Sequence, residues 1–145
     1  MPSVSRTFDT AASQQVAYDY LRDFRNAEEW DPGTRSCELV AGDGGVGTTY
    51  RNVSSFLGRE VELTYTAVEL APPGRVHLRG TNASFEGHDL FEVREAGRGA
   101  RITYSAEFSF SGASRLAVPV VAAYLPFLAN KTVEQLRAAL DGLVG

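Results

Sequence analysis

Asp89 is the residue whose place in the sequence best suits acid–base chemistry. It lies in a strand-like run from Phe85 to Val93, at the same parity as Phe91 and the other apolar residues of that run. Because side chains alternate between the two faces of a strand, this pattern predicts a carboxyl group that points inward. Burial raises the pKa of an unpaired carboxyl, and such groups act as general acids or bases. The alternative, to which we give more weight, is a structural ion pair with Arg79 or Arg101.

Four tyrosines lie on the apolar face of their predicted strand or helix: Tyr50, Tyr65, Tyr104 and Tyr124. Each provides an aromatic wall with one hydrogen-bonding tip, which suits a ligand of mixed polarity. Tyr104 and Tyr65 are the residues that we would join to Asp89 in a catalytic set. Asn52 shares a face with Tyr50 and would add another polar group. Ordinary core tyrosines whose hydroxyls reach the surface are the alternative.

Metal and nucleophile chemistry find little support in the sequence. His77 and His88 are the only histidines, on two neighbouring strand-like runs. A zinc site needs three or four ligands, and only Glu86 or Asp89 is near, so we expect no metal. His77 has the parity of a solvent-facing residue. Cys37 is the single cysteine, which excludes an internal disulfide, and no serine, cysteine or lysine is flanked by a recognisable base.

A glycine-rich segment, Gly42 to Gly47, satisfies the G-x-G-x-x-G pattern of dinucleotide-binding proteins. That pattern needs a helix directly after it, whereas Thr48 to Val53 is β-branched and aromatic and is typical of a strand. We therefore interpret the segment as a hairpin turn and expect no cofactor.

Trp30 lies in a short acidic segment with Glu28, Glu29 and Asp31. We interpret the three carboxylates as a solvated helix end. The indole is expected to plug one end of the core.

The last third of the chain predicts one long helix, from about Ser114 to Leu143. One apolar stripe along it follows steps of three and four and is expected to pack on a sheet: Val118, Ala122, Leu125, Ala129, Val133, Leu136, Leu140 and Leu143. A second apolar face exists only in the first half and consists of Leu116, Val120, Tyr124 and Phe127. Surplus apolar surface of this kind lines a ligand cavity or a partner interface, or is simply core.

The elements before this helix predict an antiparallel sheet. A strand at Val4 to Phe8 leads into a helix from Ala12 to Phe24 and a short helix from Arg25 to Trp30. Six strand-like runs follow, separated by turn residues: Ser36 to Ala41, Thr48 to Phe56, Arg59 to Leu70, Arg75 to Gly80, Phe85 to Val93 and Arg101 to Phe110. A parity change suggests a bulge near Ala67 to Val68. The fold class is α+β, with a curved sheet wrapped around the long helix.

Composition limits the classes of partner. The 145 residues fit one domain, residues 1–145, and 43% hydrophobic with 22% charged residues are ordinary globular values. Eighteen acidic against 14 basic side chains give a net charge of −4, so no nucleic acid partner is expected. The first residues lack the apolar run of a signal peptide, and no run of eighteen uncharged apolar residues follows. We expect a cytoplasmic protein without integral membrane association.

The order of these elements resembles a known superfamily. The shared features are Trp30-Asp31-Pro32-Gly33, the strand openings at Gly45 to Thr48 and Gly99 to Thr103, and the Pro72-Pro73-Gly74 hairpin. In these the chain is similar to the START-like, helix-grip superfamily, in particular its small, single-domain polyketide cyclase/dehydrase branch. The resemblance implies a curved seven-stranded antiparallel sheet gripping the C-terminal helix, with a hydrophobic cavity between them. Members of the superfamily include both enzymes and carriers.

Our leading hypothesis is a protein that binds a small, mainly hydrophobic molecule, lipid-, polyketide- or aromatic-like, between sheet and helix. The expected ligand-binding residues are Tyr50, Asn52, Leu63, Phe91, Leu116, Val120, Tyr124 and Phe127. One alternative is a polyketide cyclase or dehydratase that uses Asp89, Tyr104 and Tyr65 for acid–base chemistry in the same cavity. The other is a module that forms a homodimer through the apolar helix face.

Overall fold

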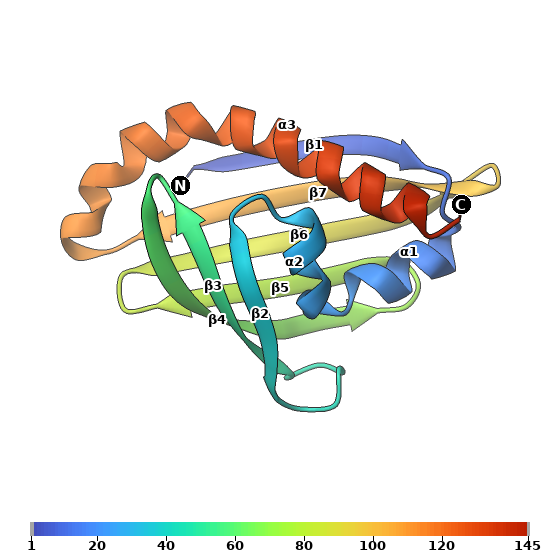
Figure 1. The fold of residues 1–145 in the computed structure, drawn as a ribbon, viewed down its shortest axis with the longest axis horizontal. Coiled ribbons are helices and arrows are strands. Elements are labelled where there is room, and N and C mark those ends of the chain that lie inside the picture. The colour runs from blue at the N-terminus through green and yellow to red at the C-terminus, as the bar shows by residue number, and fades with distance from the viewer. Residues whose placement is uncertain (1, 145) are drawn as a thin grey trace.

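Seven antiparallel strands form one sheet in the order β1-β7-β6-β5-β4-β3-β2. The computed structural model describes residues 2–144 and shows the helices on one side of this curved sheet (Figure 1). The strands are β1 (Ser3–Thr10), β2 (Thr34–Ala41), β3 (Thr49–Phe56), β4 (Arg59–Ala71), β5 (Arg75–Asn82), β6 (Phe85–Ala96) and β7 (Gly99–Phe110). The helices are α1 (Gln14–Leu21), α2 (Ala27–Trp30) and α3 (Val118–Gly142), with 3-10 turns η1 (Phe24–Asn26) and η2 (Gly112–Ala117). The predicted fold class is confirmed.

Strand burial follows the predicted alternation. In β7 the inward side chains of Ala100, Ile102, Tyr104 and Ala106 are buried, whereas their neighbours face outward. The β4–β5 pairing shifts register between Ala67 and Glu69, so the predicted bulge is confirmed. It restores the inward position of the apolar residues on both sides of the irregularity.

The glycine-rich segment is the turn between β2 and β3, as predicted. Gly42, Gly44 and Gly47 have positive φ angles, a backbone region that residues with a Cβ rarely adopt. A strand follows the turn, so the helix that a dinucleotide site requires does not follow this segment.

The long helix packs on the sheet with a stripe that differs slightly from the predicted one. Leu125, Ala129, Leu136 and Leu140 are buried as predicted, but Ala122 and Leu143 are exposed, and Val121 and Thr132 are buried in their place. With 3.6 residues per turn, positions 121 and 122 both lie about one turn before Leu125, and the packing on the sheet selects Val121. By length and composition alone, the segment from Gly112 to Gly142 would also suit a membrane span, and one such helix is weak evidence for a span.

The two halves of α3 are held differently. Leu136 and Leu140 belong to the main hydrophobic core with Trp30 and Phe91, whereas Val121, Leu125 and Ala129 are buried outside that cluster. Hydrogen bonds fasten the second half to the start of the chain. Asp141 Oδ1 accepts from Thr10 Oγ1 at 2.6 Å and from the backbone N–H of Ala11 at 2.8 Å. The first half of the helix is therefore the part that leaves room above the sheet.

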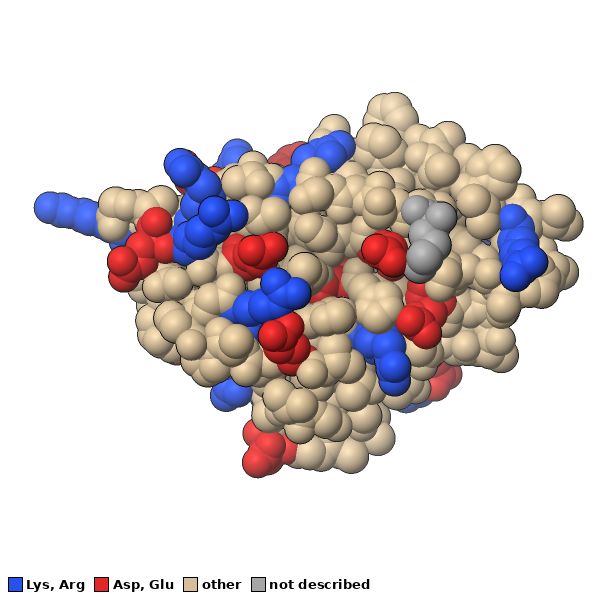
Figure 2. Space-filling view, turned by 180° about the vertical axis from the view of Figure 1, so that it is seen from behind, with Lys and Arg blue, Asp and Glu red and all other residues tan. Residues whose placement is uncertain are grey.

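The outer face of the sheet carries charges of both signs. Arg51 pairs with Glu62 at 2.7 Å, and Arg101 pairs with Asp9 at 2.8 Å. Figure 2 shows this side, with acidic and basic side chains interspersed rather than gathered into a patch of one sign. The end of the molecule at which α3 begins carries few charged side chains in the same view.

Gly99 is the position at which we expect the fold to tolerate a side chain least. A Cβ there would overlap the carbonyl oxygen of Thr10, which is backbone and cannot move aside freely. Gly99→Ala should therefore lower the free energy of unfolding by about 1–3 kcal/mol, measured by urea denaturation. Gly142→Ala is the control, because a Cβ at that position meets nothing within 4 Å, and it should not destabilise the protein. Equal stability of the two variants would contradict this account of the contact.

Candidate functional site

A cavity of about 330 Å³ lies between the sheet and the first half of α3. It is bounded by the β3–β4 hairpin, the start of β2, parts of β6 and β7, and one side of α3. Its apolar wall includes Phe56, Leu57, Val61, Leu63, Phe85, Phe108, Phe110, Ala117, Val121 and Leu128, and its polar lining residues include Asp31, Arg59, Tyr65, Asp89, Tyr104 and Thr132. Serines and Asn82 also belong to the lining, whose surface is nevertheless mainly apolar, as is usual for a small-molecule site.

Asp89 reaches this cavity from β6. The side chain is only 8% exposed, and its Oδ1 accepts a hydrogen bond of 2.9 Å from the Tyr104 hydroxyl. Burial, followed by the charge of Asp31, raises the pKa of Asp89 to about 7, against the opposing effect of the Tyr104 hydrogen bond. The carboxyl therefore exchanges its proton near neutral pH, which is the range that a general acid or base needs.

The ion-pair interpretation of Asp89 is wrong. Arg101 bonds Asp9 on β1, and Arg79 lies opposite His88, an outward-facing residue of β6. Inward and outward positions alternate along each strand, so neither guanidinium reaches the face on which Asp89 lies. The partner of Asp89 is the Tyr104 hydroxyl.

Asp31 is a cavity residue that the sequence analysis missed. It lies after α2, where we expected a solvated carboxylate, yet it is partly buried and lines the cavity. Its oxygens accept from Thr34 Oγ1 at 2.8 Å and from the Gly33 N–H at 3.1 Å. Burial raises its pKa, although both hydrogen bonds act in the opposite direction. No local pattern reveals this position, because the cavity wall comes from elements far away in the sequence.

Tyr65 joins Asp89 and Tyr104 in the cavity wall. It is 7% exposed, and its ring lies on Gly80, where a Cβ would be 2.6 Å from Tyr65 Cζ. The three residues assigned to catalysis from the sequence are thus brought together at one cavity.

The predicted ligand-binding residues on the sheet are only partly brought together there. Leu63 lines the cavity. Tyr50 and Phe91 are buried core residues outside the lining, and Asn52 bonds Thr34 and Ser54. Contact of these three with a ligand stays a prediction.

The four predicted ligand-binding residues of the helix lie on its outward side. Leu116 is 85% exposed and Phe127 is 72% exposed, with Val120 and Tyr124 at 55% and 40%. The lining residues of this segment are instead Ala117, Val121, Leu128 and Thr132. Tyr124 packs its ring against Phe56 at 6.0 Å, so the exposed helix face continues onto the β3–β4 hairpin at the edge of the cavity.

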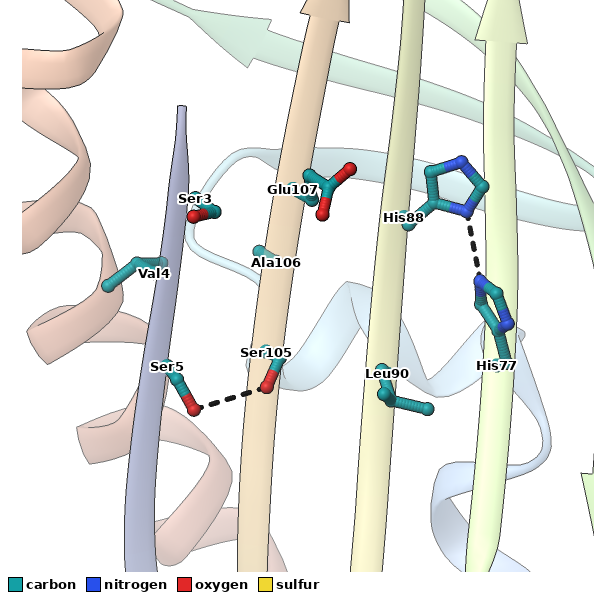
Figure 3. A pocket seen from close by; sticks show the side chains of 9 residues that line it. All are labelled: Ser3, Val4, Ser5, His77, His88, Leu90, Ser105, Ala106 and Glu107. Carbon is teal, nitrogen blue, oxygen red and sulfur yellow. Dashed lines mark hydrogen bonds between the residues drawn. The ribbon is translucent and has the colours of Figure 1, made fainter. Parts of the chain in front are cut away.

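A second hollow, of about 610 Å³, lies on the outer face of the sheet (Figure 3). The helices lie behind the strands in this view. Ser5, Ser105, Leu90, Glu107 and the two histidines stand on the opposite side, whereas Val4 and Ala106 occupy inward positions of β1 and β7. The lining residues are Ser3, Val4, Ser5, His77, His88, Leu90, Ser105, Ala106 and Glu107. We place the candidate site in the inner cavity instead, because only there do apolar walls surround the titratable groups.

His77 and His88 face each other on this outer side, which confirms the solvent-facing position predicted for His77. Their Nε2 and Nδ1 atoms lie 2.9 Å apart, and His88 Nε2 lies 2.7 Å from Glu86 Oε2. Since a carboxylate only accepts, His88 Nε2 donates to Glu86. No group of three or more His, Cys, Asp or Glu side chains within residues 2–144 is arranged to hold a metal ion.

Comparisons with known proteins agree with this architecture. The family model described as polyketide cyclase / dehydrase and lipid transport matches residues 1–144. No curated protein matches the sequence. A protein from Thermus thermophilus has a similar structure, with a TM-score of 0.81, 16% identity and coverage of 99% of this chain and 100% of the other.

Two further solved structures share the fold. A START superfamily protein from Mycobacterium smegmatis has a TM-score of 0.75 and 20% identity, over 98% of this chain and 96% of the other. The Zhui aromatase/cyclase from a Streptomyces species has a TM-score of 0.75 and 13% identity, over 97% of this chain and 91% of the other. At such identities the likeness is one of fold.

The raised pKa of Asp89 predicts a pH-dependent cost to folding. Between about pH 4 and pH 7 the folded protein keeps a proton that the unfolded chain has released, so wild-type stability falls as pH rises through this window. Asp89→Asn removes that titration. As pH rises, the free energy of unfolding of the variant should increase relative to that of the wild type, by up to roughly 1.4 kcal/mol per pH unit. Urea denaturation between pH 4 and 8 measures this difference. A difference that stays constant with pH would contradict the buried, unpaired carboxyl.

Proposed function

The chain belongs to the polyketide cyclase / dehydrase and lipid transport family, and from this premise we propose that it binds a small, mainly hydrophobic molecule between the sheet and α3. The observation that carries the proposal is the apolar cavity beneath the first half of α3. Transfer of apolar ligand surface from water into such an enclosure supplies most of the binding free energy. The few polar groups in the wall fix the orientation of the ligand.

The size of the cavity limits the ligand. About 330 Å³ is near the lower end of the range for small-molecule sites. One compact aromatic or a short alkyl chain suits this volume better than a two-chain phospholipid does. We also propose that the protein acts in the cytoplasm, in line with its single, buried cysteine.

A cyclase or dehydratase is the second candidate function, favoured by the contact between Asp89 and Tyr104 within the cavity. In a dehydration, the ionised Asp89 would take the proton from the carbon next to the carbonyl and then give it to the hydroxyl on the neighbouring carbon. The C–H electron pair forms the double bond, the hydroxyl leaves as water, and the apolar wall excludes bulk water. Such a reaction mainly requires a pocket that holds the substrate in the right shape and an ionisable group with a suitable pKa. Tyr104 would orient the carboxyl, and Tyr65 would hydrogen-bond the substrate.

Pairing of two copies is a third proposal, supported by the exposed face of Leu116, Val120, Tyr124 and Phe127. Four large apolar side chains on one side of a helix form the kind of patch that marks protein contacts. Pairing does not compete with ligand binding, since the cavity lining lies on the other side of the helix.

Two adjacent valines provide a matched test of ligand binding. Val121 lines the cavity and is 1% exposed, whereas Val120 points outward. Val121→Trp should fill the cavity and weaken binding of the neutral fluorescent probe N-phenyl-1-naphthylamine at least tenfold, while Val120→Trp should bind it as the wild type does. Circular dichroism checks that both variants are folded, and the milder Val121→Phe serves if Val121→Trp is not. Equal probe binding by all folded variants would count against the cavity as the ligand site.

Light scattering on the same samples measures the molecular mass and therefore shows whether two copies pair.

The dehydratase alternative can be tested with 4-hydroxy-4-phenylbutan-2-one, whose loss of water gives a conjugated ketone that absorbs in the ultraviolet. Wild-type protein should accelerate this reaction, and Asp89→Asn should lose about a hundredfold in rate, as expected for removal of a general acid. Val120→Trp is the control and should retain the wild-type rate. Full activity in Asp89→Asn would remove the carboxyl from the mechanism, and no acceleration by the wild type would leave binding as the function.

A further inference from the structure

We propose that the inner end of the cavity receives a positively charged nitrogen, so that the ligand is an amine carried on a mainly apolar body. This inference rests on the proposed binding function and narrows the chemical class of its ligand. It starts from the charges that line the cavity and from the polar atoms that the fold leaves without partners.

The cavity holds two carboxyl groups and no enclosed base. Within residues 2–144, neither Asp31 nor Asp89 takes part in an ion pair. Arg59 is the one basic residue of the lining, and it lies on the exposed hairpin end of β4. A carboxylate or phosphate carried into the cavity would therefore meet like charges without a counter-ion.

Two polar groups in the wall lack partners. Asp89 uses Oδ1 for the Tyr104 hydroxyl, and no other described residue bonds its second oxygen. Tyr65 lies in the lining at 7% exposure, and its hydroxyl takes part in none of the hydrogen bonds among residues 2–144. Among the described residues, the one fully buried polar side-chain atom without a partner is Trp30 Nε1, so the free atoms of Asp89 and Tyr65 are open to the cavity and within reach of a ligand group. An ammonium group brings three donors, and both the ionised Asp89 carboxylate and the oxygen of the Tyr65 hydroxyl can accept from it.

The electrostatics favour a cation over a neutral hydroxyl. Both carboxyl groups line the cavity, and the charge of Asp31 raises the pKa of Asp89, so it adds to the cost of ionising that carboxyl. A cation between them would offset that repulsion and the loss of hydration together. The aromatic rings of Tyr65 and Tyr104 add faces that attract a cation. The lining residues Val121, Leu128 and Thr132 of α3 are uncharged, so nothing on the helix side opposes this charge.

Three compounds of equal chain length compare an ammonium, a hydroxyl and a carboxylate head group: decylamine, 1-decanol and decanoate. Each is tested at pH 7.5 by displacement of N-phenyl-1-naphthylamine and, independently, by its effect on the thermal midpoint of the protein. We expect decylamine to bind at least tenfold more tightly than decanol, and decanoate to bind most weakly. Asp89→Asn and Asp31→Asn should each weaken decylamine at least tenfold and change decanol by less than about twofold, as expected for a charge-assisted contact.

Glu107→Gln is the control for net charge, because Glu107 lies on the outer face of the sheet. It should leave the preference for decylamine unchanged. Equal affinity of decylamine and decanol, a preference for decanoate, or an unchanged preference in both Asn variants would overturn the inference while leaving the cavity function intact. Absence of both probe binding and thermal shifts would instead overturn the proposed function, and this inference with it.

The pH dependence gives a second readout in the same assay. Asp31, Tyr65 and Tyr104 face Asp89, whose raised pKa of about 7 means that it ionises as pH rises toward 8. An alkylamine, like lysine, stays charged to about pH 10. Decylamine affinity should therefore increase severalfold between pH 5.5 and 8, and decanol affinity should not. A flat profile for decylamine would show that the carboxyls do not hold the nitrogen.

Discussion

The unequal attachment of α3 to the sheet is the constraint on which the rest of the structure depends. Leu136 and Leu140 are fully buried in the main core, and Asp141 is bonded to the turn after β1. The first half of the helix buries its inward residues outside that core, above the β3–β4 hairpin. If both halves were packed alike, the space would be filled, since protein interiors are packed as densely as organic crystals. The cavity is thus what remains where the sheet curves away from a helix that is anchored at one end.

The polar groups in that cavity carry a cost that the fold does not offset by itself. A buried carboxyl that has one hydroxyl partner and a second carboxyl nearby is destabilising in its charged form. Proteins with ordinary cores avoid such arrangements, or pair the charge with a base. Here the bases form ion pairs on the outer face of the sheet, at Arg51, Arg75 and Arg101. Polar groups that face a cavity and destabilise the fold without a ligand are better explained by a role in ligand binding than by a structural role.

The sequence was sufficient for the elements and for some of the site residues. Alternation in β6 and β7 predicted that Asp89 and Tyr104 point inward, because the period of a strand is fixed by its backbone. The partner of Asp89 was predicted wrongly, since proximity in the sequence says nothing about which face an arginine occupies. Asp31 was missed because the cavity that it lines is built largely from elements far away in the sequence, such as β6, β7 and α3. The helix face nearest the cavity was also misjudged, because an apolar pattern on two sides of a helix does not tell which side meets the sheet.

The strand order has a consequence for the time at which the site comes into being. β1 pairs with β7, so that Ser3 lies opposite Glu107, and α3 is fastened to the end of β1 through Asp141. The contacts of β1 can therefore form only after β7 and α3 have been synthesised. Such long-range closure slows folding relative to proteins built from local contacts. On the ribosome, the cavity can acquire its roof only after nearly the whole chain has emerged, and a bound ligand would stabilise the finished fold rather than guide its assembly.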